Sequence, residues 1–327
     1  ITHHTNFTNA NAHVQRPSPS PTKLFIKFHN TSHPLSFAIW KPLEPTNVSE
    51  ANICHAYAAT GHGAQTYGIF QTQDGITGRI DQFLDARTLE PNDVEDPTIR
   101  ASVASTLAVF HNMHHTAPLK PVSAFYDALI PALKKYHGLA KLKSLGIEAG
   151  VNVDALIDYD FASKVTNVVA KLSSLNAKSA LCLHDVQFMN VLVKNNPSAN
   201  EHKTILIDFE FALRNYRAFD IGGHFMQKLF KWFDEESKIA NCRPYSESEK
   251  KDFCEAYNKK WNETTGDSDT AEQVYLEAQY GYMLAIAFDV HNMLAWMYDM
   301  DDKDPLNALG LNKLLDEFVA QYAKMGL

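Results

Sequence analysis

The sequence lacks a hydrophobic segment long enough to cross a membrane. Nowhere in its 327 residues do 18 apolar residues follow one another, and about that length is needed to span a bilayer. The longest candidate, YMLAIAFDVHNMLAWMY at 282–298, is interrupted by Asp289 and His291. We therefore expect a buried helix at this place and no membrane span.

Cysteine pairs and an excess of positive charge are also missing. None of the four cysteines belongs to a C-x-x-C pair, so we expect neither a zinc ribbon nor a thioredoxin motif. Such cysteine usage favours a reducing compartment, and we expect a cytoplasmic protein. Because the chain begins at Ile1 and not at Met, an organelle reached with a removable targeting peptide stays open. The formal net charge of −8 gives no reason to expect nucleic acid as a partner.

The composition itself is that of an ordinary globular protein, with 45% apolar and 21% charged residues. The first part predicts a strand at 23–30, a helix at 49–61 capped by Ser49, and a hairpin at 67–84. The remainder predicts helices at 96–115, 120–143, 152–174 and after 220, with short strands at 191–193 and 204–207. We therefore predict an α+β fold with a small α/β lobe at 1–84 and a large, mainly helical lobe at 85–327.

Acidic and amide side chains interrupt two neighbouring apolar runs. In LCLHDVQFMNVLV, at 181–193, Asp185 and Asn190 are five residues apart, and Asp208 and Glu210 follow the apolar run TILI. Phosphoryl transfer requires a carboxylate that accepts the proton of a hydroxyl, together with oxygen ligands for Mg²⁺. We predict that Asp185 is the base and that Asn190, Asp208 and Glu210 hold the metal.

The same chemistry requires a basic residue for the phosphates and a carboxylate to hold it. Lys27 in the strand LFIKF and Glu50 on the helix that follows are the candidates. Each of these pieces alone has a simpler explanation, because a D-x4-N spacing is common by chance and IDFE can end an ordinary strand. Their order along one chain, each on the expected element, favours the catalytic interpretation.

A histidine group offers a separate metal site. HNMHH places His111, His114 and His115 at helical spacing on one face. No fourth ligand is apparent, and ordinary histidines at a helix end are the simpler interpretation.

Three longer motifs resemble those of the choline/ethanolamine kinase family, a branch of the protein-kinase-like fold. ILIDFEFALRNYRAFDIGGHF at 205–225 is similar to the most specific signature of the family. CLHDVQFMNVLV at 182–193 resembles its catalytic loop, and GRIDQFLDARTL at 78–89 resembles the hinge between its lobes. The resemblance implies a two-lobed kinase that uses ATP and Mg²⁺.

The resemblance also implies roles for individual residues. It makes Asp185 the catalytic base with Gln187 beside it, and Asn190 a catalytic residue on the metal side. It assigns the nucleotide to Lys27 and Glu50, to the backbone near Gln82, Phe83 and Leu84, and to Asn9 at the end of the phosphate loop. It assigns the metal to Asn190, Asp208 and Glu210. For the acceptor alcohol it points to Phe211, Gln227, Trp232, Trp296 and Tyr298.

Several family positions are altered in this chain. Thr5 and Asn6 stand at the glycines of the phosphate loop, where backbone must approach phosphate closely. Leu183 replaces the histidine of the family's H-x-D motif, and His184 stands one position too late to replace it. At the acceptor site Gln227 replaces a glutamate that would attract a cation.

Two functions therefore remain open. The first is an ATP- and Mg²⁺-dependent kinase for the hydroxyl of choline, ethanolamine or a similar small amino alcohol, at the first step of phosphatidylcholine or phosphatidylethanolamine synthesis. The second is a degenerate relative that serves as a structural subunit of a larger assembly. Because members of the family are often dimers, a homodimer or a larger assembly is a further expectation.

Overall fold

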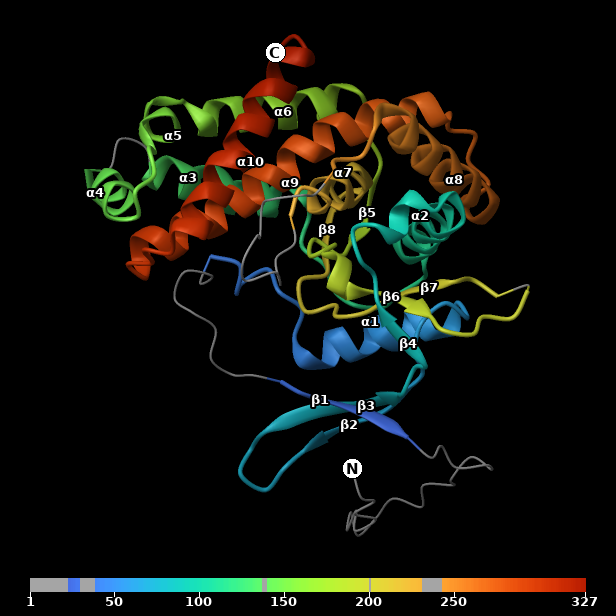
Figure 1. Ribbon diagram of the computed structural model, residues 1–327. Coiled ribbons are helices and arrows are strands. Elements are labelled where there is room, and N and C mark those ends of the chain that lie inside the picture. The colour runs from blue at the N-terminus through green and yellow to red at the C-terminus, as the bar shows by residue number, and fades with distance from the viewer. Residues whose placement is uncertain (1–22, 30–38, 137–139, 200, 231–242) are drawn as a thin grey trace.

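The protein, seen here as a computed structural model, has a small sheet-bearing lobe below a large helical lobe (Figure 1). The structure describes residues 23–29, 39–136, 140–199, 201–230 and 243–327. This is the predicted α+β, protein-kinase-like architecture. Helix α1 (Asn47–Ala59) lies between the small sheet and the helical lobe.

The small lobe is built on a three-stranded antiparallel sheet in the order β1-β3-β2. Its strands are β1 (Leu24–Phe28), β2 (Thr66–Gln71) and β3 (Thr77–Gln82). The predicted hairpin turn is present between β2 and β3, where Gly75 has a φ of +90° that favours glycine. The predicted cap of α1 was wrong by three residues, because Thr46 and not Ser49 accepts the backbone N–H of the first turn.

Two smaller antiparallel sheets join the lobes and support the loop that carries Asp185. The first sheet contains β4 (Ala86–Thr88), β6 (Val191–Lys194) and β7 (Thr204–Leu206), and it includes the two strands predicted from the sequence. The second pairs β5 (Ser179–Cys182) with β8 (Leu213–Tyr216). Strands β4, β5 and β8 were not predicted, because three or four residues show almost no alternation. The equally short β6 and β7 were recognised because a polar loop separates their apolar runs.

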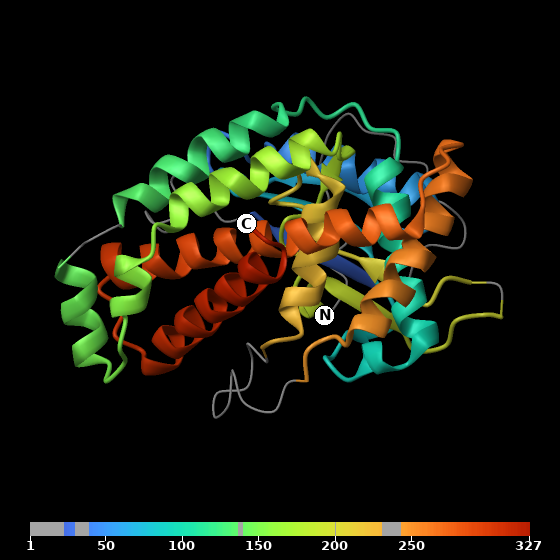
Figure 2. The same cartoon turned by 90° about the horizontal axis from the view of Figure 1, so that it is seen from above.

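Helices form the rest of the described chain (Figure 2). Asp96 caps α2, and Pro97 is its first residue. The helices expected at 120–143 and 152–174 are each divided, the second because Asp160 caps a new helix at Phe161. The helices are α2 (Pro97–Asn112), α3 (Val122–Lys135), α4 (Ala140–Glu148), α5 (Asp154–Asp158), α6 (Phe161–Ser174), α7 (Arg217–Gln227), α8 (Glu247–Thr265), α9 (Ala271–Asp299) and α10 (Pro305–Lys324).

The centre of the helical lobe is the crossing of α7 and α9, whose backbones touch. A Cβ atom added to Gly281 would lie 1.8 Å from the carbonyl oxygen of Ala218, and one added to Gly222 would lie 2.0 Å from the backbone nitrogen of Tyr282. Glycine is needed at both positions because no side chain fits between the helices. Although α9 is long, none of the helices in the described ranges combines the length and the apolar composition needed to cross a membrane.

Candidate active site

Lys27 connects the small lobe to the acids that follow β7. Its Nζ lies 3.2 Å from Oε1 of Glu50 on α1, 2.5 Å from Oδ1 of Asp208 and 3.1 Å from Oε2 of Glu210. Burial alone would lower the pKa of Lys27, but the three carboxylates outweigh burial and raise this pKa well above its usual range. The structure therefore brings together four residues that the sequence places up to 183 positions apart.

Arg79 on β3 is a member of this cluster that was not assigned from the sequence. It lies opposite Lys27 in the β1–β3 pairing, and its Nη1 is 2.8 Å from the same Oε1 of Glu50. Burial would raise the pKa of Glu50, yet the charges of Lys27 and Arg79 lower it. The sequence signal was the alternation Arg79, Asp81 within a strand, which puts both charged side chains on one face. Glu50 thus keeps one cationic partner if Lys27 moves to a phosphate.

Asp185 and Asn190 are joined at the other side of the site. The Nδ2 of Asn190 donates to the backbone oxygen of Asp185 at 3.0 Å and to its Oδ2 at 2.9 Å. Both contacts use the amide nitrogen, so the Oδ1 of Asn190 takes no part in them and can coordinate a cation. The backbone N–H of Ile207 donates to the backbone carbonyl oxygen of Asn190 at 2.9 Å. This bond fixes Asp208, the next residue, beside the loop.

The environment of Asp185 suits a general base. Burial is the main cause that raises the pKa of Asp185 to about 6, and the charge of Asp208 adds to it, whereas a hydrogen bond with Gln187 opposes the shift. A carboxylate whose pKa lies near neutrality accepts a proton in the transition state more effectively than an ordinary aspartate.

The residues predicted to hold Mg²⁺ fit such an ion. Asp208 and Glu210 offer carboxylate oxygens and Asn190 offers an amide oxygen, which are the ligands that Mg²⁺ prefers. The ammonium group of Lys27 lies between the two acids and shows that their carboxylates converge on a single positive charge. Asp208 also has a φ of +63°, a left-handed conformation that aspartate tolerates better than most residues.

The predicted hinge has free backbone groups for a nucleotide base. The N–H of Gln82 is bound to the oxygen of Gln65 at 2.7 Å, and the oxygen of Leu84 accepts from Ala86 at 3.0 Å. Across the described ranges, no hydrogen-bond partner is found for the carbonyl of Phe83 or the N–H of Leu84. This donor and acceptor are of the kind that an adenine edge requires. Asn9, predicted for the phosphate loop, lies outside the described residues.

The residues predicted for the acceptor are scattered. Gln227 is buried at the end of α7, Phe211 is half-buried, and Trp296 is 37% exposed near the end of α9. Tyr298 packs against Tyr136 and carries the ammonium groups of two lysines over its ring, so its face already has cationic partners. Trp232 lies outside the described residues.

Asp289 on α9 is a second carboxyl group beside the catalytic loop, and the sequence offered it only as a break in an apolar run. A Cβ on Gly223 would touch Val186 at 2.8 Å and Ala285 at 3.4 Å, so this face of α9 borders the loop, and Asp289 is one turn further along the same face. Burial and then the charge of Asp185 raise the pKa of Asp289 to about 8. No described residue pairs with its carboxyl group, so Asp289 lacks a counter-ion there.

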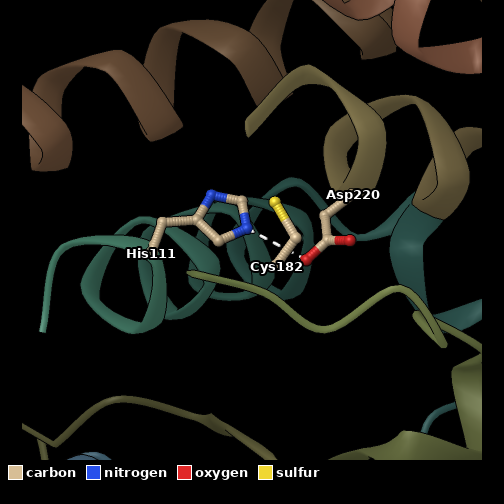
Figure 3. A group of neighbouring side chains, drawn as sticks. All are labelled: His111, Cys182 and Asp220. Carbon is tan, nitrogen blue, oxygen red and sulfur yellow. Dashed lines mark hydrogen bonds and ion pairs between the residues drawn. The ribbon is translucent and has the colours of Figure 1, made fainter. Parts of the chain in front are cut away.

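Three side chains converge behind the catalytic loop, namely His111 of α2, Cys182 at the end of β5 and Asp220 of α7 (Figure 3). Their ligand atoms lie within 4.8 Å of one another, but hydrogen bonds already engage them. Asp220 accepts from Nε2 of His111 at 3.0 Å and from the backbone of the catalytic loop, and the thiol of Cys182 donates to the oxygen of Tyr216. We therefore assign the group to positioning of the loop.

The histidine face proposed from HNMHH is not formed. Helix α2 ends at Asn112, His111 points into the core, and His114 is exposed. The ring of His111 is instead held between Asp220 and the hydroxyl of Tyr257, which lies 2.7 Å from its Nδ1.

Comparison with known proteins agrees with this geometry. The sequence model of the choline/ethanolamine kinase family matches residues 20–298. A human choline/ethanolamine kinase is 28% identical over 182 residues, which cover 56% of this chain and 43% of the relative. The chain is thus matched to less than half the length of that relative.

Solved structures show the same fold at low identity. A choline kinase from Cryptosporidium parvum superposes with a TM-score of 0.59 at 12% identity, covering 92% of this chain and 90% of that structure. LicA, a choline kinase of Streptococcus pneumoniae, superposes in its complex with AMP with a TM-score of 0.52 at 14% identity, covering 91% of this chain and 84% of that one. Given the family match over most of its length, the chain belongs to the choline/ethanolamine kinase family.

Proposed function

We propose that the protein is an ATP- and Mg²⁺-dependent kinase that phosphorylates the hydroxyl group of choline, ethanolamine or a similar small amino alcohol. The observation that carries the proposal is the convergence of Lys27, Glu50, Asp208 and Glu210 beside the bonded pair Asp185 and Asn190. These groups supply the base, the phosphate-binding cation and the oxygen ligands that phosphoryl transfer requires.

Each group has a task in the proposed reaction. Asp185 accepts the proton of the acceptor hydroxyl, and Asn190 holds one carboxylate oxygen of Asp185 so that the other faces the acceptor. Lys27 moves from Asp208 to the phosphates while Arg79 keeps Glu50 neutralised. Asn190, Asp208 and Glu210 hold Mg²⁺, which when bound neutralises the charge that develops on the phosphoryl group. The product alcohol phosphate is a precursor of phospholipid head groups.

The carboxyl groups beside the loop support a cationic acceptor. Asp185 and Asp289 are close enough for the charge of Asp185 to act on Asp289, and desolvation keeps both pKa values high in the absence of a cation. An ammonium group between them would allow both to ionise, since an opposite charge favours the carboxylate form. Asp289 thereby replaces the negative charge that is lost at Gln227.

One observation favours the alternative of a degenerate structural subunit. Lys27 already neutralises Asp208 and Glu210 directly, so the acids are stable without a metal. In that case Lys27 would serve as a permanent link between the lobes, and neither nucleotide nor Mg²⁺ would displace it.

Turnover and nucleotide binding separate the two functions. We would measure ATP consumption with choline and with ethanolamine for the wild type, for Asp185→Ala and for Asp316→Ala, an exposed aspartate on α10 that serves as control. The kinase proposal expects activity that only Asp185→Ala abolishes, together with a rise in melting temperature on adding Mg·ATP. Absence of both turnover and thermal shift in the wild type would leave the structural subunit as the function.

A further inference from the structure

His184, the residue before the catalytic aspartate, has a left-handed backbone with a φ of +61°. This conformation costs energy for residues with a Cβ and is kept only where the surroundings stabilise it. The side chain is 4% exposed. Its ring packs on Phe219 with centroids 4.6 Å apart and on Phe125 with centroids 4.8 Å apart. His184 is therefore fixed in the core of the helical lobe, although it belongs to a loop.

Hydrogen bonds on both ring nitrogens determine the tautomer of His184. Oδ1 of Asn215 accepts from the hydroxyl of Tyr126 at 2.7 Å and from the N–H of Tyr216 at 2.8 Å, so the amide nitrogen of Asn215 must point the other way. That nitrogen donates to Nε2 of His184 at 2.9 Å. Nε2 is then an acceptor, Nδ1 carries the proton, and Nδ1 donates to the backbone oxygen of Cys182 at 3.3 Å.

The backbone at the same place is bound as firmly as the side chain. The carboxylate of Asp220 accepts the N–H of Leu183 at 2.5 Å and the N–H of His184 at 3.0 Å. Asn215 lies on β8 and Asp220 on α7. The two residues immediately before Asp185 are thus attached to two separate elements of the helical lobe.

We propose that His184 is the positioning residue of the catalytic loop, and that it takes over from position 183 the support that a leucine cannot give. The side chain of Leu183 is buried among apolar side chains and contributes only packing. The left-handed backbone of His184 directs its ring back to Cys182 on β5 and Asn215 on β8. The hydrogen-bonded attachment stands independently of catalysis, whereas its effect on rate rests on the proposed kinase function.

The attachment is tested without activity by NMR of the histidine nitrogens and by hydrogen exchange of the full chain. The matched variants are His184→Asn, which keeps a residue that tolerates the left-handed backbone, and Phe318→Leu, a core substitution on α10 that lowers stability elsewhere. The wild type should show His184 as a neutral ring protonated on Nδ1. Amides of the segment 183–190 should exchange at least tenfold faster in His184→Asn but not in Phe318→Leu.

Two results would overturn the proposal. One is a His184 ring protonated on Nε2 or titrating near neutrality, and the other is equal exchange of 183–190 in the two variants. The rate arm uses the same proteins, and we expect kcat to fall at least tenfold in His184→Asn with an unchanged Kd for Mg·ATP. If amides 183–190 exchange faster in His184→Asn but the wild type shows no turnover, the attachment is upheld and the kinase function is rejected. If they exchange faster but kcat is unchanged in His184→Asn, the positioning role is overturned.

Discussion

The ammonium group of Lys27 lies 2.5 Å from the carboxylate of Asp208, across 181 positions of sequence. Lys27, on the small sheet, thus neutralises Asp208, which is predicted to hold the metal. In the proposed kinase, binding of Mg·ATP exchanges this contact for a contact between Lys27 and phosphate.

Two substitutions of Lys27 should show whether the rate depends on the positive charge of this side chain or on its shape. We expect Lys27→Met to lower kcat/KM by at least about 100-fold, because both the acids and the phosphates lose a cation. Lys27→Arg keeps the charge, and we expect a loss of less than about tenfold. Lys41→Met, an exposed lysine whose side chain is 65% accessible, serves as control. Steady-state kinetics measures kcat/KM for each variant. Equal losses of kcat/KM in Lys27→Met and Lys27→Arg would contradict a role of the charge.

The pH dependence of the rate should report Asp185. A base must be ionised to accept a proton, and the pKa of Asp185 is raised to about 6. We therefore expect kcat/KM to rise with pH through an apparent pKa of about 6 and to fall about tenfold per unit below it. Rates measured between pH 5 and 8 test this, and a rate that stays nearly constant down to pH 5 would show that Asp185 keeps the ordinary pKa of aspartate, about 4, and is not desolvated.

Asp289 should control affinity for a cationic acceptor. Its pKa is raised to about 8, so the fraction ionised in the empty site grows between pH 7 and 9, and choline affinity should grow with it. We expect Asp289→Asn to raise the Kd for choline about tenfold and to remove this dependence, at an estimated cost of about 1.4 kcal/mol.

Gln227→Glu complements Asp289→Asn, and calorimetry measures the Kd for choline in both variants. It returns a carboxylate to the end of α7 and should tighten choline binding. An Asp289→Asn protein that binds choline as the wild type does, with the same pH dependence, would exclude Asp289 from the acceptor site.

Buried histidine should make stability depend on pH. Burial lowers the pKa of His184 to about 4 in the folded protein, against about 6.5 when unfolded. The unfolded state therefore binds more protons between these values, and the stability from this residue is complete above pH 6.5 and lost as pH falls towards 4.

The change is measurable by comparison with His184→Asn. We expect urea unfolding to show a smaller loss of stability from pH 7 to pH 5 in the variant, by up to about 1.4 kcal/mol per pH unit. The other buried histidines stay constant between the two proteins, so the difference isolates this site. Parallel curves for the two proteins would mean that His184 binds a proton as readily in the folded protein as in the unfolded one.

Substitution at the crossing of α7 and α9 should be poorly tolerated. Gly281→Ala places a methyl group 1.8 Å from the oxygen of Ala218, and we expect at least about 3 kcal/mol of destabilisation because neither backbone can move aside. Gly68→Ala meets no atom within 4 Å and should change stability by less than about 1 kcal/mol. Denaturant unfolding of both variants provides the check.

Strong local signals in the sequence predicted much of the fold. Strand β1, the β2–β3 hairpin, helices α1 and α2 and the β6–β7 pair follow from apolar periodicity and turn residues. The divided helices were missed because their apolar spacing continues beyond the point where Asp160 starts a new helix. Three predicted acids and Lys27 converge because each lies at an end or on a face of a predictable element.

The missed residues depend on contacts between distant elements. Asp289 is a single acid in an apolar helix, and only the packing of α9 and Val186 on either side of Gly223 places it near Asp185. His184 stands one position from the family's histidine, but a left-handed backbone changes where its ring points. The sequence alone does not show where the ring of His184 lies, because a change in a single φ angle redirects the side chain.

The glycine contact between α7 and α9 has a consequence for movement. Asp220, which anchors the catalytic loop, lies on α7, and Asp289 lies on α9. Two helices in backbone contact cannot slide past one another, so the base and the acceptor-side carboxyl form one rigid unit. In the proposed kinase, closure on substrate therefore brings the nucleotide to a fixed acceptor, with the small sheet and α1 as the moving part.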